Sequence, residues 1–303
     1  MVKSNFDVYG LGQCAWDHIG QIEKYPLPDS KCEISDLITQ GGGPVATALV
    51  AISRWGFSCS FCGIIGDDYT GQQIIRSLED EDVNTDHIII REGFQSQQAF
   101  IAAEKNGGRR TIFWRRPTGQ AAQPEEINMA MISTSLIFYT DGLFADASIA
   151  GARAAKQAGR IVVADAGTLR DGMLELSKYC DYFIVSESFA KALVSGDDPY
   201  KACERLRKLG PKVVGVTLGE RGYLVQHQNN WIERPAYQVN AIDTTGCGDL
   251  FHAGIALGIL KKWDLEKSLD FAAWAAASVS TRLGGRAGIP SLDAYQTRLN
   301  KSP

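Results

Sequence analysis

Short apolar runs alternate with helical patterns through the second half of the chain. The runs that read as strands are LIFYT (136–140), RIVVAD (160–165), DYFIVS (181–186) and KVVGVTLG (212–219). The amphipathic stretches between them cover 147–158, 171–178 and 187–208. Buried strands separated by helices are typical of a parallel sheet covered on both faces. The pattern predicts an α/β fold.

The first half follows the same scheme with two interruptions. Strands are predicted at 6–12 and 58–65, and helices at 44–55 and 70–80. The interruptions, at about 12–40 and 95–116, show strand-like alternation, and the second contains a hairpin signal, Asn-Gly-Gly at 106–108. Strands that leave a doubly wound layer can form a small separate sheet, which in an enzyme can act as a lid. We predict one domain over residues 1–303 with such a lid.

Composition and charge indicate which classes of binding partner this chain is expected to have. With 303 residues, 45% of them hydrophobic, a net charge of −4 and a pI near 5.7, it lacks the basic balance of a nucleic-acid-binding protein. The N-terminus has no secretory pattern, and no stretch reaches the roughly 18 apolar residues that a membrane helix needs. We expect a cytoplasmic protein that binds small molecules and neither nucleic acid nor membrane.

Seven cysteines are scattered along the chain without an even framework of spacings. Reduced thiols fit this usage better than disulfides. Cys59 and Cys62 form the one CxxC pair, inside an apolar run and without a second pair to complete a zinc site. We interpret them as buried structural thiols.

The stretch NAIDTTGCGDLFHAG, residues 240–254, carries the strongest chemical signal. Gly246 and Gly248 let the backbone turn tightly, and the helix that follows directs its free N–H groups at the same place. Such a helix start favours phosphate, and a carboxylate at Asp249 would lie beside it as a ready base. On spacing alone, an ordinary helix start explains the stretch equally well. No GxxxxGK[ST] occurs, so it is not a P-loop.

DTTGCGDLFHAG resembles the DTxGAGDxF motif of the PfkB, or ribokinase-like, carbohydrate kinase family, with Cys247 where alanine is usual. Three further segments resemble family motifs in the same order: GGGPVATALVAISRWG (41–56), CGIIGDDYTG (62–71) and VTLGERGYLV (216–225). The resemblance implies a three-layer, Rossmann-like α/β/α domain with a small β lid. It also implies ATP-dependent transfer of the γ-phosphate to a sugar hydroxyl.

The resemblance assigns the reacting groups. Asp249 corresponds to the general base, and the backbone amides of Gly246, Cys247 and Gly248 to the anion hole for the transferring phosphoryl group. Asp17, in GQCAWDHIG, corresponds to the aspartate that accepts hydrogen bonds from the substrate hydroxyls.

Further positions are implied to surround the two substrates. Gly42 and Gly43 match the backbone that passes under the sugar. The positions implied to border ATP are Thr217, Gly219, Gly222, Gly285 and Arg286. The cofactors implied are ATP and Mg²⁺, and the late loop at 285–286 is implied to hold a monovalent cation such as K⁺. For Gly285 and Arg286 a plain loop explains the sequence equally well.

The chain departs from the family pattern at two places. Pro44 stands where many members have asparagine, and Ser186 and Glu187 stand in place of the NxxE motif near the magnesium. Glu187 is therefore our candidate for a contact to the metal through water. Together with the GGRAGIP ending, these features resemble the sulfofructose kinase-like branch of the family.

Two other functions start from specific residues. GLGQCA, residues 10–15, fits a dinucleotide-binding GxGxxA, yet the segment after it lacks helical periodicity and contains Pro26 and Pro28. A dehydrogenase is therefore disfavoured. The altered NxxE motif favours a non-catalytic sugar- or nucleoside-binding protein, whereas the intact GCGD motif opposes it.

The lid segment suggests two further features. Arg115 and Arg116 end its second strand, and adjacent residues of a strand point to opposite faces, so one of them could hold an anionic group on the substrate. A charged strand edge is the plain alternative. A small sheet also leaves one face without helices, so we expect a homodimer through the lid.

Overall fold

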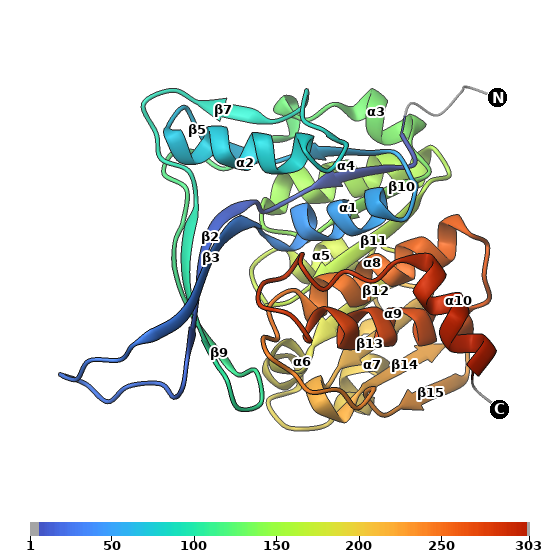
Figure 1. Cartoon of the computed structure of the whole chain (residues 1–303). Helices are drawn as coiled ribbons and strands as arrows, with labels where there is room; N and C mark the ends of the chain where they lie inside the picture. Colours follow the sequence, from blue (N-terminus) through green and yellow to red (C-terminus); the bar gives the residue numbers. More distant parts are fainter. Residues whose placement is uncertain (1–5, 302–303) are drawn as a thin grey trace.

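A nine-stranded sheet forms the middle layer of the computed structural model, which describes residues 6–301 (Figure 1). In spatial order its strands are β15 (Asn230–Arg234), β14 (Tyr223–His227), β13 (Val213–Thr217), β12 (Tyr182–Ser186), β11 (Ile161–Ala166), β10 (Ile137–Thr140), β1 (Val8–Leu11), β4 (Cys59–Cys62) and β6 (Val83–Asn84). The strands from β13 to β6 are parallel, which confirms the predicted α/β sheet. At the other edge β14 and β15 run antiparallel, which the pattern did not predict.

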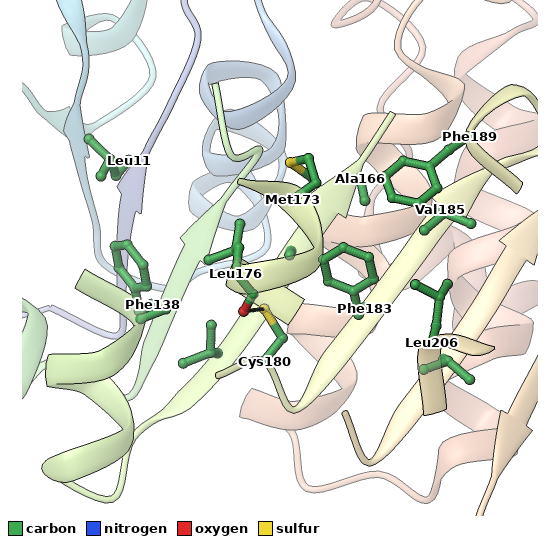
Figure 2. Close-up of a cluster of buried hydrophobic side chains, with 14 of the residues drawn as sticks. Leu11, Phe138, Ala166, Met173, Leu176, Cys180, Phe183, Val185, Phe189 and Leu206 are labelled. Atoms are coloured by element: carbon green, nitrogen blue, oxygen red, sulfur yellow. Dashed lines mark hydrogen bonds between the residues drawn. The ribbon is translucent and has the colours of Figure 1, made fainter. Parts of the chain in front are cut away.

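Helices cover both faces of this sheet. One face carries α1 (Pro44–Arg54), α2 (Tyr69–Glu79), α8 (Cys247–Leu260), α9 (Leu265–Val279) and α10 (Leu292–Lys301). The other carries η1 (Pro124–Glu126), α3 (Met129–Thr134), α4 (Ala145–Gln157), α5 (Met173–Ser177), α6 (Glu187–Val194) and α7 (Pro199–Arg207). On that face Phe138, Leu176 and Phe183 belong to one buried hydrophobic cluster (Figure 2). The predicted helices at 147–158, 171–178 and 187–208 are confirmed to within a few residues.

A second, four-stranded sheet projects from the body of the molecule (Figure 1). Its strands, in order, are β3 (Ile34–Gly42), β2 (Ala15–Ile22), β8 (Gln98–Glu104) and β9 (Arg110–Arg115). This confirms the predicted small sheet, which we call the lid. Because β2 pairs with β8, the lid joins two segments that are about 80 residues apart in the sequence.

The predicted strand at 58–65 is two strands rather than one. After β4 the chain turns at Gly63 into β5 (Ile64–Gly66), which pairs with β7 (Ile89–Arg91) in a separate two-stranded sheet. A side chain at Gly63 would meet the Phe61 ring at 2.5 Å and the Gly12 carbonyl oxygen at 2.7 Å. The apolar run continues through the break, so periodicity alone did not reveal it.

The thiols and the helices agree with the sequence reading where the structure describes them. All seven cysteines are free, and both Cys59 and Cys62 are buried in β4, as expected of structural thiols. Within residues 6–301 no helix is both long enough and apolar enough to cross a membrane.

Candidate active site

The loop from Asp243 to Asp249, which we call the anion loop, is held together by a buried carboxylate. Asp243 accepts hydrogen bonds from the backbone N–H of Thr245 at 2.9 Å, the hydroxyl of Thr245 at 2.7 Å and the N–H of Gly284 at 2.9 Å. Gly246 then begins α8 with φ 82°, and an added Cβ there would lie 2.7 Å from Cα of Gly285. Glycine is therefore required at this turn, and Gly285 packs directly behind the anion loop.

Asp249 lies half-buried in the first turn of α8. Burial, and next the negative charge of Asp165, raise its pKa to about 7, while Arg110 and His252 oppose the rise. A carboxylate that titrates near neutral pH suits a general base. Burial likewise raises the pKa of Cys247 to about 12, so its thiol stays neutral and adds no charge to the anion loop.

Asp17 lies on β2 with only 5% of its surface exposed. The glycines at the end of β3 make room for it: a Cβ on Gly42 would lie 1.8 Å from Oδ2 of Asp17, and Gly43, at φ 97°, approaches the carbonyl oxygen of Gln13. Burial raises the pKa of Asp17 to about 7, and the charge of Arg286 opposes it. The negative charge of Asp17 in turn raises the pKa of Asp249, so the two predicted groups share one site.

Strand register decides which lid residues face this site. Opposed residues of paired strands share a face, and so do alternate residues of one strand. Asp17 pairs with Ala99, Ala99 with Trp114, and Ala103 with Arg110. Asp17, Trp114 and Arg110 therefore point from the inner face of the lid toward the anion loop.

Arg110 makes the contact between the lid and the anion loop. Its Nη1 donates to the Thr244 hydroxyl at 2.6 Å, and that hydroxyl and the Thr244 N–H donate to the Gly108 carbonyl oxygen at 3.0 and 3.1 Å. Gly108 has φ 62°, and an added Cβ would lie 3.1 Å from the Asp243 nitrogen. The tip of the lid hairpin therefore rests on the anion loop, with a guanidinium beside Asp249.

The two arginines predicted from the sequence lie at the other end of β9. Arg115 pairs with Gln98, which shares the outer face with Phe100, so its side chain points away from Asp17. Its charge lowers the pKa of Asp68 instead. Arg116 follows the strand and is exposed. Of the two predicted arginines, only Arg116 lies an even number of residues from Trp114 and Arg110. Continued alternation along the chain would direct its side chain to the inner face of the lid.

The positions predicted to border the nucleotide lie at the carboxyl end of β13. Thr217 pairs with Ser186 at the end of β12, and Gly219 follows with φ 61°. Gly222 is required by the turn itself, because a Cβ there would lie 2.0 Å from the Arg234 carbonyl oxygen. In parallel sheets this edge is where ligands bind.

Two charged residues predicted near the nucleotide are engaged with other groups. Glu187 begins α6 and forms ion pairs with Arg221 at 2.9 Å and Lys191 at 2.5 Å. Arg286 is 6% exposed, its Nη1 donates to the Ser77 carbonyl oxygen at 3.0 Å, and burial lowers its pKa to about 10. A Cβ on Gly41 would lie 2.7 Å from that Nη1, so the guanidinium packs behind β3, on the substrate side.

Within the described residues no three histidine, cysteine or acidic side chains cluster in a way that could hold a metal ion by themselves. Mg²⁺ in phosphoryl-transfer sites is commonly held by one or two carboxylates together with substrate phosphates and water.

A half-buried carboxylate at a helix start, the anion loop and a lid over them are the arrangement expected of a phosphoryl-transfer site, and the family comparison agrees. Residues 7–292 match the model of the pfkB family carbohydrate kinases. The chain belongs to this family. It is a carbohydrate kinase, a phosphotransferase with an alcohol group as acceptor.

Relatives and solved structures of PfkB kinases match the chain over nearly its whole length. Fructokinase-2 of Oryza sativa subsp. japonica is 28% identical over 320 residues, which cover 97% of this chain and 94% of the relative. An ATP-dependent ribose-1-phosphate kinase of Halopiger xanaduensis is 26% identical over 97% of this chain and 98% of the relative. The ribokinase of Thermotoga maritima superimposes with a TM-score of 0.84 at 24% identity, covering 98% of this chain and 100% of that one.

Sequence reasoning missed four residues of the PfkB site: Asp243, Arg110, Asp165 and His252. Asp243 and His252 lie within the quoted motif, and Arg110 opens the second lid strand, but nothing in the sequence showed what they contact. Asp165 ends the run RIVVAD, and a polar residue at the carboxyl end of a buried parallel strand is a usable signal.

Proposed function

We propose that the chain transfers the γ-phosphate of ATP to a hydroxyl of a sugar or sugar derivative, with Asp249 as general base. The observation that carries this assignment is the placement of Asp249. It lies in the first turn of α8 behind the glycines of the anion loop, with a pKa raised to about 7, in a site shared with buried Asp17.

In this proposal Asp17 accepts hydrogen bonds from substrate hydroxyls and so directs the reacting hydroxyl at Asp249. Asp249 removes its proton as the hydroxyl oxygen bonds to the γ-phosphorus, while the bond from that phosphorus to the bridging oxygen of ADP breaks and ADP leaves. The backbone N–H groups of Gly246, Cys247 and Gly248 stabilise the negative charge of the transferring phosphoryl group, because they lie at a helix N-terminus. The N–H of Cys247 also donates to the Thr244 carbonyl oxygen at 3.3 Å. Arg110 brings a positive charge to the same place from the lid.

Thr217, Gly219, Gly222 and Gly285 are our candidates to border ATP, since they lie around the carboxyl end of β13 and behind the anion loop. Mg²⁺ bound to the ATP phosphates would neutralise part of their charge. Glu187 would reach that metal through water, a role that competes with its ion pairs to Arg221 and Lys191. We also retain Arg286 as a candidate nucleotide-binding residue of the late loop at 285–286. K⁺ is the candidate monovalent cation that this loop would bind.

The substrate class stays open between neutral and anionic sugars. Named relatives include fructokinases, a nucleoside kinase and a kinase of ribose 1-phosphate, whose substrate is anionic. Arg110 and Arg116 are the basic lid residues available to an anionic group on this chain. The likeness to the sulfofructose kinase-like branch and the cytoplasmic location stay predictions.

An ADP-release assay over a panel of sugars tests the function. The panel contains fructose, ribose, ribose 1-phosphate, sulfofructose and adenosine, each with ATP and Mg²⁺, and Asp249→Asn serves as the inactive control. We expect ADP release above the control with at least one of them, and a phosphorylated product by mass spectrometry. Binding of a sugar or nucleoside without ADP release would favour the non-catalytic alternative.

We also propose that two copies associate through the outer face of the lid. This face exposes Leu37, Phe100 and Phe113, at 56%, 46% and 52% of their surfaces. Contiguous exposed apolar side chains on a sheet without helices are typical of a protein interface.

Light scattering should give about twice the chain mass of 33.0 kDa. Phe113→Asp should shift the mass toward that of one chain, because it buries a charge at the centre of the interface. Tyr69→Asp, at another exposed aromatic residue outside the lid, is the matched control. A wild-type mass near 33.0 kDa would contradict the proposal.

A further inference from the structure

His252 lies one turn beyond Asp249 on α8, and the steps above make no use of it. Its side chain is 3% exposed. Nδ1 lies 2.8 Å from the carbonyl oxygen of Gly248, and Nε2 lies 3.1 Å from the carbonyl oxygen of Ile184 in β12. Both ring nitrogens therefore face groups that only accept hydrogen bonds.

A neutral imidazole cannot satisfy both of these contacts. It has one N–H, and its second nitrogen would direct a lone pair at a carbonyl oxygen in a buried place, where an unmade hydrogen bond is unfavourable. An imidazolium donates from both nitrogens. We propose that His252 is an imidazolium that keeps Asp249 ionised, which makes it a positioning residue for the reaction proposed above, on which this inference rests.

The charges around His252 agree with this assignment. Oδ2 of Asp165, on β11, lies 3.5 Å from Nδ1, and that oxygen is buried without a hydrogen-bond partner within the described residues. Asp249 lies three residues before His252, so both share one side of α8. The imidazolium thus lies beside the Asp165 carboxylate and acts on the charge of Asp249, and a buried positive charge favours the ionised form of a neighbouring carboxylate.

The other elements around this group contribute two more charges, one ring and the buried hydroxyl of Tyr139 on β10, whose pKa is raised by burial and then by the charges of Asp165 and Asp249. Arg110 from β9 and Asp17 from β2 act on Asp249 with opposite signs. Phe251 presents its ring to His252 at a centroid distance of 6.2 Å. Arg110 belongs to the lid, whereas His252 lies in the body of the domain. His252 therefore supplies the positive charge that is present whether the lid is open or closed.

This arrangement has a consequence for the pH dependence of the reaction. Burial and Asp165 raise the pKa of Asp249 to about 7, and the charge of His252 lowers it. Without that charge the pKa of Asp249 would rise further. A larger fraction of the enzyme would then hold a protonated, inactive base at neutral pH.

Nitrogen-15 NMR of the histidine rings tests the charge directly and needs no kinase activity. The sequence has four histidines, so a variant with His18, His87 and His227 each replaced by Gln keeps His252 as the labelled ring of the chain. We expect both ring nitrogens to show the protonated signature from pH 6.5 to 8.5. One protonated and one bare nitrogen at pH 7 would overturn the proposal and leave the kinase function untouched.

The kinetic test uses His252→Gln, whose amide has no charge but can still donate to one carbonyl oxygen. We expect the acid limb of kcat against pH to move up by about one unit, which is about a tenfold loss at pH 6.5, with KM for ATP unchanged. Phe251→Leu, at the adjacent buried position, is the control for simple repacking. A loss of kcat that is equal at every pH in both variants would show a structural role and overturn the proposal.

Discussion

The anion loop and the lid each supply half of the candidate site, but the loop is built from consecutive residues and the lid from segments far apart in the sequence. The loop is seven consecutive residues, closed on itself by Asp243 and fixed by a left-handed turn at Gly246. The lid is four strands from two distant segments, and both of its faces expose large side chains such as Trp114 and Phe113. A local motif can therefore position the base, whereas the residues that reach the substrate from above depend on strand register.

The two regions also differ in what their charges do. In the loop, a carboxylate is held where burial disfavours its charged form, which prepares Asp249 to take a proton near neutral pH. In the lid, the arginines of β9 are exposed, and of these two described residues only Arg110 donates a hydrogen bond to the loop. The comparison predicts large effects from changes in the loop and graded effects along the lid.

The largest expected effect is at Asp249 itself. Asp249→Asn removes the base but keeps the size of the side chain, so kcat should fall by about 10² to 10⁴-fold, or roughly 3 to 5 kcal/mol, with ATP binding retained. Steady-state kinetics and calorimetric titration with ATP measure the two quantities. Retention of more than about a tenth of the wild-type kcat would remove Asp249 from the base role.

The lid should contribute next through Arg110. Arg110→Met should lower kcat by about 30- to 100-fold, close to 2 to 3 kcal/mol, because a charge beside the transferring phosphoryl group is lost. Arg109→Met is the matched control, since Arg109 is an adjacent exposed arginine that makes no hydrogen bond or ion pair to the loop within the described residues. Equal and small losses from both would mean that the lid acts only as a cover.

The raised pKa of Asp249 should also make the free energy of unfolding depend on pH. Because the folded pKa of Asp249 is raised to about 7 from an ordinary 3.8, the folded state holds this proton more tightly than the unfolded state does. Its contribution to stability is therefore present below pH 4 and is lost as pH rises through 7. At pH 8, allowing for partial burial, Asp249→Asn should be about 2 kcal/mol more stable than wild type, which corresponds to a Tm about 4 °C higher. At pH 5 the stability of the variant should be closer to that of wild type. Thermal unfolding at the two pH values measures this; a Tm difference that does not depend on pH would contradict it.

The smallest expected effect distinguishes the two ends of β9. If the substrate is anionic, Arg116→Met should raise its KM about tenfold, whereas Arg115→Met, on the outer face, should change it less than twofold. Both variants are measured with the best sugar from the panel and with ATP at saturation. Equal KM values for both variants and wild type would end the anionic-substrate proposal.

Much of this site was predictable because its information is local. The glycines of the anion loop, the helix after it and Asp249 follow one another in the chain, so spacing alone indicated a helix N-terminus, and the family resemblance favoured an anion site there. The apolar runs indicated the parallel strands for the same reason, because burial on both faces requires continuous apolar residues. Asp17 was assigned from the family resemblance and lies in the site with Asp249.

The rest was decided by contacts between residues far apart in the sequence. Arg115 and Arg110 lie five residues apart on one strand, and only the pairing of β9 with β8 shows that Arg110 shares the face of Asp17. His252 meets Ile184, 68 residues away, because α8 packs on the sheet over β12. Chain order does not specify strand register or helix packing, since both depend on how all the side chains fill one core at once. The sequence by itself therefore determined the helix start at the anion loop and the candidate base in its first turn, and the tertiary structure decided which charges surround them.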